Sequence, residues 1–229
     1  MGKDKLKRFA ENARMENVLE PSIDEVLAKD SPFKGKWSTY FDNYNPIVLE
    51  LACGKGEYTV GMARKFPNKN FIGIDIKGAR MWRGAKTALH EEMANLYFLR
   101  TRIEFIERFF DKDEISEIWI TFADPHKKKR NAKHRLTHPL FLDRYRNLLI
   151  PKGTINLKSD STFLTDFTLD VIHEQGLKVL YQSLDVYGIG KEKFPEELNA
   201  LMEIKTFYEK RWLKEGKKIK FIQFRIDRN

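Results

Sequence analysis

The sequence predicts an α/β fold: a doubly wound, mostly parallel sheet of about seven strands with helices on both faces. Short apolar runs alternate with helix-length amphipathic segments from residue 47 onward, and this alternation is typical of parallel α/β domains. The runs are almost continuously apolar, as strands buried on both faces are. The first run, residues 47–51, leads through a turn containing Gly54 and Gly56 directly into a helical pattern. Strand, glycine turn and helix N-terminus together predict a nucleotide-type pocket.

Each further element is predicted from apolar periodicity bounded by turn residues. The predicted strands are 47–51, 70–75, 96–100, 116–122, 154–158, 178–184 and 218–226. The predicted helices are 57–66, 79–94, 102–110, 138–149, 161–175 and 206–214. Upstream of these, Ser22-x-x-Glu25 is a capping box that predicts a short helix toward Lys29.

Length and charge favour one domain with a basic extension. Residues 1–20 carry five cations among sparse hydrophobic residues, so we expect a mobile basic arm there. The predicted organisation is a basic arm and short helix over 1–45, followed by one domain over 46–229. The net charge of +9 over 229 residues predicts an anionic partner, and nucleic acid fits this expectation.

The sequence also predicts a cytoplasmic location. Cys53 is the only cysteine, so disulfides within the chain are excluded and a reducing compartment is expected. Its most economical interpretation is a small packing residue beside the glycine turn. No apolar run reaches transmembrane length, and residues 1–20 lack a signal-peptide core. The sequence leaves the oligomeric state open, with a homo-oligomer among the options.

Acidic residues stand where predicted strands end, which is where parallel α/β sheets bind ligands. Glu50 lies at the end of the first predicted strand. Asp75 ends the second strand, about twenty residues after Gly54, where a carboxylate can accept from ribose hydroxyls. The dinucleotide fingerprint G-x-G-x-x-G does not fit, because Tyr58 and Thr59 stand where its third glycine would fall.

A third acid is followed by a dense group of cations. Residues 118–122 form an apolar strand pattern, and Asp124 follows it after a single residue, Ala123. Six cations occur in the nine residues after His126, a segment that we call the basic loop: Lys127, Lys128, Lys129, Arg130, Lys133 and Arg135. No acid interrupts the chain between Asp124 and Asp143. This density beside a predicted site favours a nucleic-acid backbone over ordinary solvated surface.

These motifs resemble those of a known enzyme family. An acid ending the first strand and a G-x-G-like turn resemble the opening of class I S-adenosylmethionine-dependent methyltransferases. The stretch 122–135 resembles the Phe-Pro-Asp-Pro-Trp-x-Lys-x-Arg-x-x-Lys-Arg-Arg stretch of bacterial tRNA (guanine-N7)-methyltransferases. Residues 206–211 resemble that family's Thr-x-x-Glu-x-Arg. The resemblance spans about residues 45–215 and implies a Rossmann-like domain that methylates guanosine N7 in the tRNA variable loop.

The resemblance also implies roles for individual residues. S-adenosylmethionine is the implied cofactor and tRNA the implied partner, with no membrane and no metal. Asp124 is the predicted catalytic residue. The predicted cofactor-binding residues are Glu50, Gly54, Gly56, Asp75, Arg102 and Asp124. The predicted substrate-binding residues are Lys128, Asp160, Thr206, Phe207, Tyr208 and Glu209.

Four positions depart from the family pattern. Ala52 replaces a glycine, His126 a tryptophan and Ala123 a proline. Arg102 stands where the family has an aspartate that holds the adenine side of the cofactor. We therefore expect backbone groups near Arg102 to line that pocket, and we assign no carboxylate role at this position.

Simpler structural roles compete at several of these sites. Asp160 fits the N-cap of a helix, and Thr206-x-x-Glu209 reads as a capping box. His134 and His138 have the spacing of a metal pair, but no Cys/His set completes a site. The competing functions are a related methyltransferase acting on another RNA base or a small molecule, and a non-catalytic RNA-binding module.

Overall fold

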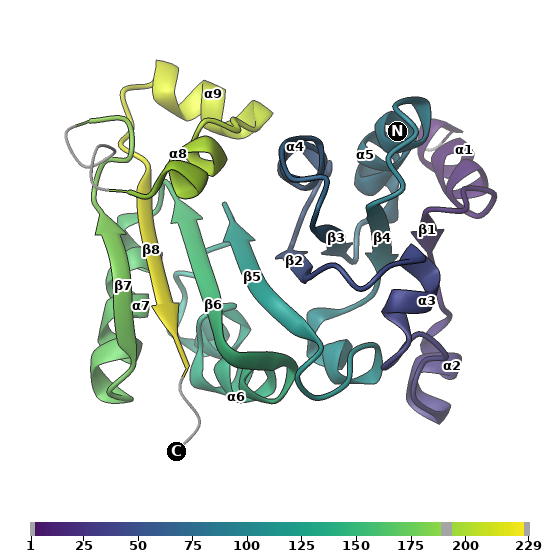
Figure 1. The fold of residues 1–229 in the computed structure, drawn as a ribbon. Coiled ribbons are helices and arrows are strands. Elements are labelled where there is room, and N and C mark those ends of the chain that lie inside the picture. Colours follow the sequence, from purple (N-terminus) through teal and green to yellow (C-terminus); the bar gives the residue numbers. More distant parts are fainter. Residues whose placement is uncertain (1–2, 189–193, 227–229) are drawn as a thin grey trace.

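The computed structural model describes residues 3–188 and 194–226, which form one eight-stranded sheet flanked by helices (Figure 1). The strands are β1 (Val18–Leu19), β2 (Ile47–Leu51), β3 (Asn70–Asp75), β4 (Leu96–Arg100), β5 (Ile115–Thr121), β6 (Leu149–Ser159), β7 (Lys178–Ser183) and β8 (Lys220–Arg225). Their order across the sheet is β1-β4-β3-β2-β5-β6-β8-β7. Only β8 runs antiparallel to its neighbours, β6 and β7. The predicted fold class is confirmed, with β1 as an additional strand at the edge.

The helices follow the predicted alternation. They are α1 (Lys3–Asn12), α2 (Ile23–Ala28), α3 (Trp37–Phe41), α4 (Glu57–Lys65), α5 (Gly78–His90), α6 (Pro139–Leu148), α7 (Thr162–Glu174), α8 (Glu196–Met202) and α9 (Phe207–Lys214). Two segments are 3-10 helices: η1 (Ile103–Arg108) and η2 (Lys129–His134). The capping box of Ser22 and Glu25 forms as predicted at the start of α2.

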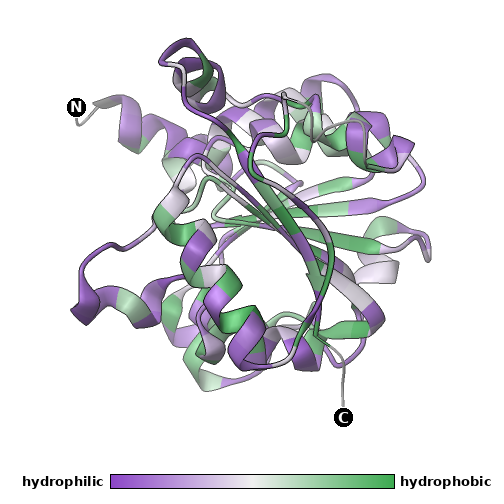
Figure 2. Ribbon diagram, turned by 90° about the vertical axis from the view of Figure 1, so that its left-hand side faces the viewer, coloured by the Kyte–Doolittle hydropathy of each residue, from purple (hydrophilic) through white to green (hydrophobic). Residues whose placement is uncertain are grey.

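The sheet separates two hydrophobic cores. Every residue of β2 and β3 is buried, because side chains that alternate along a strand meet helices on both faces. Leu49 and Ile72 pack on the side of α3, α6 and α7. Val48 and Phe71 pack on the opposite side, with α4, α5 and α8. Figure 2 shows this arrangement as hydrophobic strands between helices whose outer faces are hydrophilic.

The N-terminal segment differs from the prediction of a mobile arm. Residues 3–12 form α1, which packs against α5 through polar and aromatic contacts. The Asn12 side-chain amide donates to the Gly78 carbonyl (2.9 Å), and the Trp82 indole donates to the Glu11 carboxylate (2.6 Å). The Arg8 guanidinium lies 4.9 Å from the Trp82 ring centroid. Specific polar partners on α5 therefore order a segment whose hydrophobic content is low.

Candidate active site

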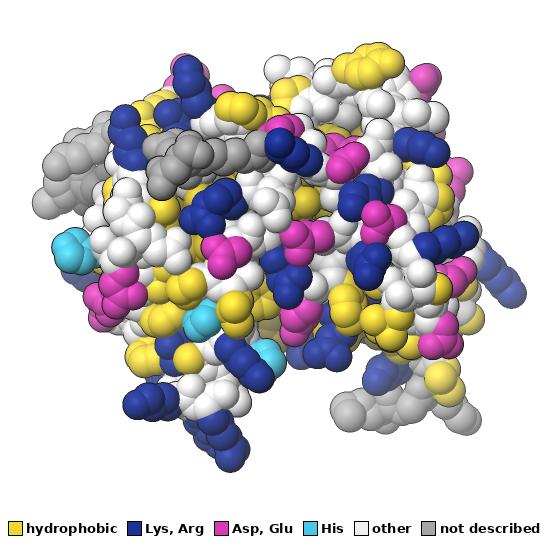
Figure 3. Space-filling view, turned by 90° about the horizontal axis from the view of Figure 1, so that it is seen from below, with side chains coloured by type: hydrophobic (Ala, Val, Ile, Leu, Met, Phe, Trp, Pro, Cys, Tyr) yellow, Lys and Arg dark blue, Asp and Glu magenta, His cyan; other side chains and the backbone are white. Residues whose placement is uncertain are grey.

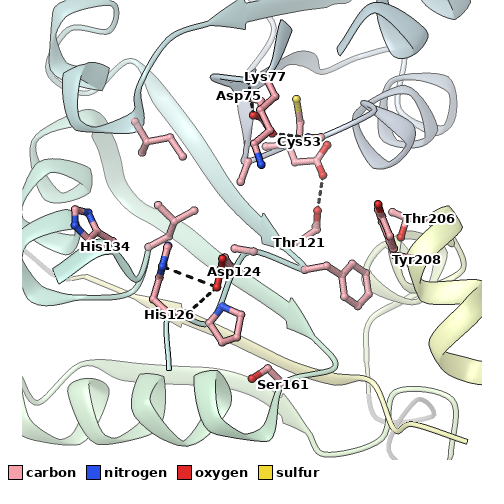
Figure 4. Close-up of a pocket in the computed structure, with 18 of the residues that line it drawn as sticks. Cys53, Asp75, Lys77, Thr121, Asp124, His126, His134, Ser161, Thr206 and Tyr208 are labelled. Atoms are coloured by element: carbon pink, nitrogen blue, oxygen red, sulfur yellow. Dashed lines mark hydrogen bonds and ion pairs between the residues drawn. The ribbon is translucent and has the colours of Figure 1, made fainter. Parts of the chain in front are cut away.

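A cavity of about 1030 Å³ lies at the carboxyl ends of β2, β3, β5 and β6 (Figure 4). Eight of the twelve predicted site residues line it: Glu50, Gly54, Asp75, Arg102, Asp124, Asp160, Thr206 and Tyr208. Four do not: Gly56, Lys128, Phe207 and Glu209. In Figure 4, Asp75 lies at the top of the view, Asp124 near the middle, and Thr206 and Tyr208 on the right beside α9, with Thr121 between Asp124 and Tyr208. We call Glu50, Gly54 and Asp75 the cavity floor, and residues 122–128 the cavity rim.

Glu50 is the most deeply buried acid of the floor. Its carboxylate accepts hydrogen bonds from the hydroxyls of Thr59 on α4 and Thr121 on β5. Burial raises the pKa of Glu50 to about 7, although the two hydroxyl donors favour the charged form. Neither threonine was predicted as a site residue. The sequence does not show which distant residue an isolated threonine hydroxyl will contact.

Asp75 is fixed by the backbone of two turns. Its carboxylate accepts from the Gly54 amide (2.9 Å) and from the Lys77 amide (2.8 Å). Gly54 has φ of +59°, and a Cβ there would meet nothing closer than the Ala52 carbonyl at 4.0 Å. The floor is therefore open toward the cavity beside Gly54, as a ligand that approaches the backbone requires.

The glycine turn explains two features of the sequence. Ala52 adopts φ of +58°, a left-handed conformation that favours glycine. The family's glycine at this position is therefore explained by the left-handed backbone conformation, which strains the alanine of this chain. Gly56 also has positive φ, and a Cβ would lie 2.5 Å from the Phe98 ring. Gly56 therefore serves close packing beneath the turn, not the cavity surface.

Cys53 lies in the same turn and is buried. Burial raises the pKa of its thiol, and the neighbouring carboxylates of Glu50 and Asp75 raise it further. A thiol in this environment stays protonated, and only the thiolate is nucleophilic. These properties support its interpretation as a packing residue.

The rim presents Asp124 on a tightly turned segment. Phe122 and His126 both have positive φ, at 51° and 43°. The Asp124 carboxylate accepts from the His126 amide (2.9 Å), and its side chain is 73% exposed. Unlike the floor acids, it therefore keeps most of its oxygen surface available to a ligand.

One residue of the basic loop has a different role from the other five. Arg135 is buried: its guanidinium donates to the His126 carbonyl (3.1 Å) and lies 4.4 Å from the Phe167 ring centroid. The expectation that Arg135 reaches RNA phosphate is wrong, because this side chain holds the rim from behind. The remaining cations are exposed, and none has an ion pair among the described residues: Lys127, Lys128, Lys129, Arg130 and Lys133.

Charge elsewhere on the surface is mixed. Figure 3 shows a face on which Lys and Arg side chains are interspersed with Asp and Glu over much of the area. On this face, therefore, the positive charge is not uniform. Groups of cations without acidic neighbours, such as the exposed part of the basic loop, stand out against this background.

Asp160 lies on the far wall of the cavity, between β6 and α7. The N-cap of α7 is Ser161, whose hydroxyl accepts from the Leu164 amide (3.2 Å), so the N-cap interpretation of Asp160 is wrong. The Asp160 carboxylate instead lies 3.6 Å from the Lys217 ammonium, with the carboxylate side chain 21% exposed.

The capping box at the start of α9 forms as the sequence predicts. The Thr206 hydroxyl accepts from the Glu209 amide (3.2 Å), and the Glu209 carboxylate accepts from the Thr206 amide (3.4 Å). The Glu209 side chain is fully buried and forms an ion pair with the equally buried Lys158 on β6 (2.9 Å). Tyr187 also donates to Glu209 (2.6 Å). Glu209 therefore supports the cavity wall from behind and offers no surface to a substrate.

Arg102 lines the cavity, and its cation pairs with a neighbouring acid. Its side chain is about half exposed and its guanidinium lies 3.6 Å from the Glu104 carboxylate. The described residues contain no cluster of three or more potential metal ligands. Within the same residues, no helix is long and apolar enough to cross a membrane.

The sequence and the fold both match known methyltransferases. Residues 44–222 match the family described as "Putative methyltransferase". A protein of Christiangramia forsetii named tRNA (guanine-N(7)-)-methyltransferase is 53% identical over 98% of both chains. A Bacteroides fragilis protein of the same name is 48% identical over 98% of this chain and 86% of its own. The crystal structure of the 16S rRNA methyltransferase KamB matches the fold with a TM-score of 0.63, at 15% identity over 87% of this chain and 95% of that one.

The matches cover the whole sheet and both sides of the cavity. Identity of about half over nearly the full length of both chains is far above what shared fold alone produces. The chain belongs to the tRNA (guanine-N(7)-)-methyltransferase family.

Proposed function

We propose that this protein transfers the methyl group of S-adenosylmethionine to N7 of a guanosine in tRNA. The observation that carries the proposal is a cavity in which a buried acidic floor adjoins a rim that presents the exposed Asp124 and leads into the basic loop. Such a cavity suits one small cationic ligand and one polyanionic ligand at the same time. The names and similarity of the relatives support the same reaction.

The residues of the floor suit this cofactor. When bound, S-adenosylmethionine supplies an electrophilic methyl group on a cationic sulfonium. Asp75 would accept from ribose hydroxyls with the lone pairs that the Gly54 and Lys77 amides leave free. The open space beside Gly54 lets a ligand approach the backbone. Glu50 would place a negative charge in the most buried part of the site, where electrostatic interactions are strongest.

The nucleophile, guanine N7, does not need to be deprotonated before it reacts. Guanine N7 has an in-plane lone pair and no proton, so attack on the methyl group requires no general base at the nucleophile. Catalysis then depends on in-line positioning and on stabilising the base as it becomes cationic. Asp124 is the exposed carboxylate in the middle of the cavity and suits that role (Figure 4).

The substrate side must hold a guanosine that has left regular RNA structure. The major groove of A-form RNA is deep and narrow, so N7 within a helix is poorly accessible. A splayed guanine would present N1–H and N2–H to a carboxylate such as Asp160. Thr206 and Tyr208 would line its path, while the exposed cations of the basic loop, Lys128 among them, would contact phosphates. The variable loop, a cytoplasmic location and any self-association remain predictions.

Transfer assays decide between this function and its alternatives. Incubation with methyl-labelled cofactor and bulk tRNA should yield labelled N7-methylguanosine, which chemical strand cleavage at that base then maps. Label in another base would instead indicate a related RNA methyltransferase. Calorimetry with S-adenosylmethionine tests the remaining alternative, because a non-catalytic RNA-binding module would bind tRNA but not the cofactor.

A further inference from the structure

A second groove adjoins the cavity next to α9. It has a volume of about 220 Å³ and is lined by the glycine turn, α4, α5 and the residues around α9. Lys55 and Glu57 line both this groove and the main cavity. We call it the α9 groove. Its other lining residues are Val60, Arg83, Gly84, Thr87, Lys205 and Lys210.

The α9 groove is strongly basic. Four of its lining residues are cations, and the only acid among them is Glu57. That carboxylate already accepts from the Phe207 amide (2.8 Å), at the first residue of α9. None of Lys55, Arg83, Lys205 and Lys210 has an ion pair within the described ranges. Cations from three separate chain segments thus converge on one concavity without carboxylate partners.

A series of aromatic rings connects the cavity to this groove. Phe122 at the rim lies 5.2 Å from Trp212, and Trp212 lies 5.8 Å from Tyr208, measured between ring centroids. Tyr208 in turn lies 5.6 Å from Phe207, whose ring is 4.2 Å from the Lys55 ammonium. Phe207 is 54% exposed. An exposed phenylalanine between a catalytic cavity and a basic groove is a stacking surface for an unpaired base.

We propose that the α9 groove is a second RNA-binding surface, which holds the backbone of nucleotides next to the target guanosine while Phe207 stacks on one of their bases. The inference rests on the proposed function and extends it. Splayed RNA segments are recognised by aromatic stacking combined with cationic contacts to phosphate. In Figure 4, His134 of the basic loop lies on one side of Asp124, and Thr206 and Tyr208 next to the groove lie on the other, so RNA that enters across one surface would leave across the other.

Charge removal tests the groove. The groove variant combines Arg83→Gln, Lys205→Gln and Lys210→Gln. The control variant combines Lys112→Gln, Lys152→Gln and Lys178→Gln, which removes three exposed cations near the amino ends of β5, β6 and β7. We expect the groove variant to bind tRNA roughly ten-fold more weakly. The slope of log affinity against log salt should become flatter by about two. The control should keep the parental slope.

Stacking is tested separately. Phe207→Ala should weaken tRNA binding roughly ten-fold with an unchanged salt slope, because stacking releases no counterions. Tyr44→Ala serves as its control, since Tyr44 is 95% exposed and lines neither cavity nor groove. Calorimetric affinity for S-adenosylmethionine and thermal unfolding should match the parent in all four variants.

The outcomes separate the two proposals. If the parent methylates tRNA but the groove variant and Phe207→Ala both bind tRNA like their controls, the second surface is wrong and the proposed function stands. If the parent neither binds nor methylates tRNA, the proposed function itself fails. Equal weakening by the groove variant and its control would also overturn the second surface, because it would show a general charge effect.

Discussion

The floor and the rim of the cavity both present carboxylates, but the floor carboxylates are buried and the rim carboxylate is exposed. Glu50 and Asp75 are 1% and 9% exposed and are fixed by threonine hydroxyls or backbone amides. Asp124 has a 73% exposed side chain and one backbone donor. The floor is therefore pre-organised before any ligand arrives, whereas the rim keeps its charge free for the substrate. Removal of a floor acid should cost cofactor affinity, and removal of the rim acid should cost rate.

The same contrast separates the lysines and arginines around the cavity. Lys158 and Arg135 are buried and hold the cavity walls from behind. The exposed cations of the basic loop have no such partners within the part of the chain that the structure describes. Burial lowers the pKa of Lys158 to about 8, while its pairing with Glu209 opposes that shift. Burial therefore separates the cations that support the cavity walls from the exposed cations, which are available to a ligand.

The largest expected effect concerns the buried ion pair. Glu209→Ala leaves the Lys158 ammonium without its carboxylate in the core, so the free energy of unfolding should fall by about 3–5 kcal/mol. Glu91→Ala is the exposed counterpart: it removes the partner of Arg64 (2.7 Å) and should cost less than about 1 kcal/mol. Urea denaturation measures both. Similar losses in the two variants would contradict the distinction between buried and exposed pairs.

The next largest effect concerns the floor. Asp75→Ala should weaken S-adenosylmethionine binding by roughly ten- to hundred-fold, because the ligand loses a charged hydrogen-bond acceptor. Affinity for tRNA should be nearly unchanged. Glu117→Ala is the matched control, since this acid on β5 pairs with Lys69 and does not line the cavity. Calorimetry on folded variants checks the prediction, and unchanged cofactor affinity in Asp75→Ala would remove Asp75 from the site.

The floor should also give cofactor binding a pH dependence. Burial raises the pKa of Glu50 from its ordinary 4.5 to about 7 in the free protein. A cationic sulfonium favours the ionised form, so affinity should rise roughly ten-fold between about pH 6 and 8. The raised pKa also stabilises the fold at low pH, and that contribution is lost as pH rises through about 7. Glu50→Gln should flatten both profiles; a mutant that keeps the parental pH dependence would assign it to another group.

The smallest expected effect concerns the exposed cations of the basic loop. Replacing Lys129, Arg130 and Lys133 together by Ala should flatten the salt slope of tRNA binding by about two while leaving cofactor affinity intact. Arg135→Ala provides the contrast, because it loosens the rim and should lower turnover with little change in slope. A triple variant with the parental slope would show that these cations face solvent in the complex.

Much of the fold could be predicted because the strand patterns are strong. The bounds of β2, β3 and β4 agree with the predicted ranges. β6 begins at Leu149, five residues before the predicted start, and its register with β5 is interrupted before Thr154. Pro151 and Gly153 at that interruption resemble a turn in the sequence. The predicted helix over 102–110 is the shorter 3-10 segment η1.

The parts that could not be predicted depend on contacts between distant residues. The segment 3–12 looks too polar to pack, yet Trp82 and Gly78 on α5 supply its partners. Glu209 is part of a recognisable capping box, but nothing in that motif indicates that Lys158 lies beneath it. The strand-end acids were identifiable because parallel topology brings strand ends together. Burial decides which of these residues can contact a ligand, and the spacing of residues in the sequence does not predict burial.

Asp124→Asn tests the central claim most directly, because it removes the rim charge, preserves the shape and leaves an acceptor for the His126 amide. Single-turnover transfer of a labelled methyl group to tRNA guanosine should slow by at least about ten-fold. Affinities for S-adenosylmethionine and tRNA, measured on the same preparation, should stay close to those of the parent. Parental transfer rates, or a loss of tRNA affinity as large as the loss of rate, would contradict the assignment of Asp124 to transition-state stabilisation.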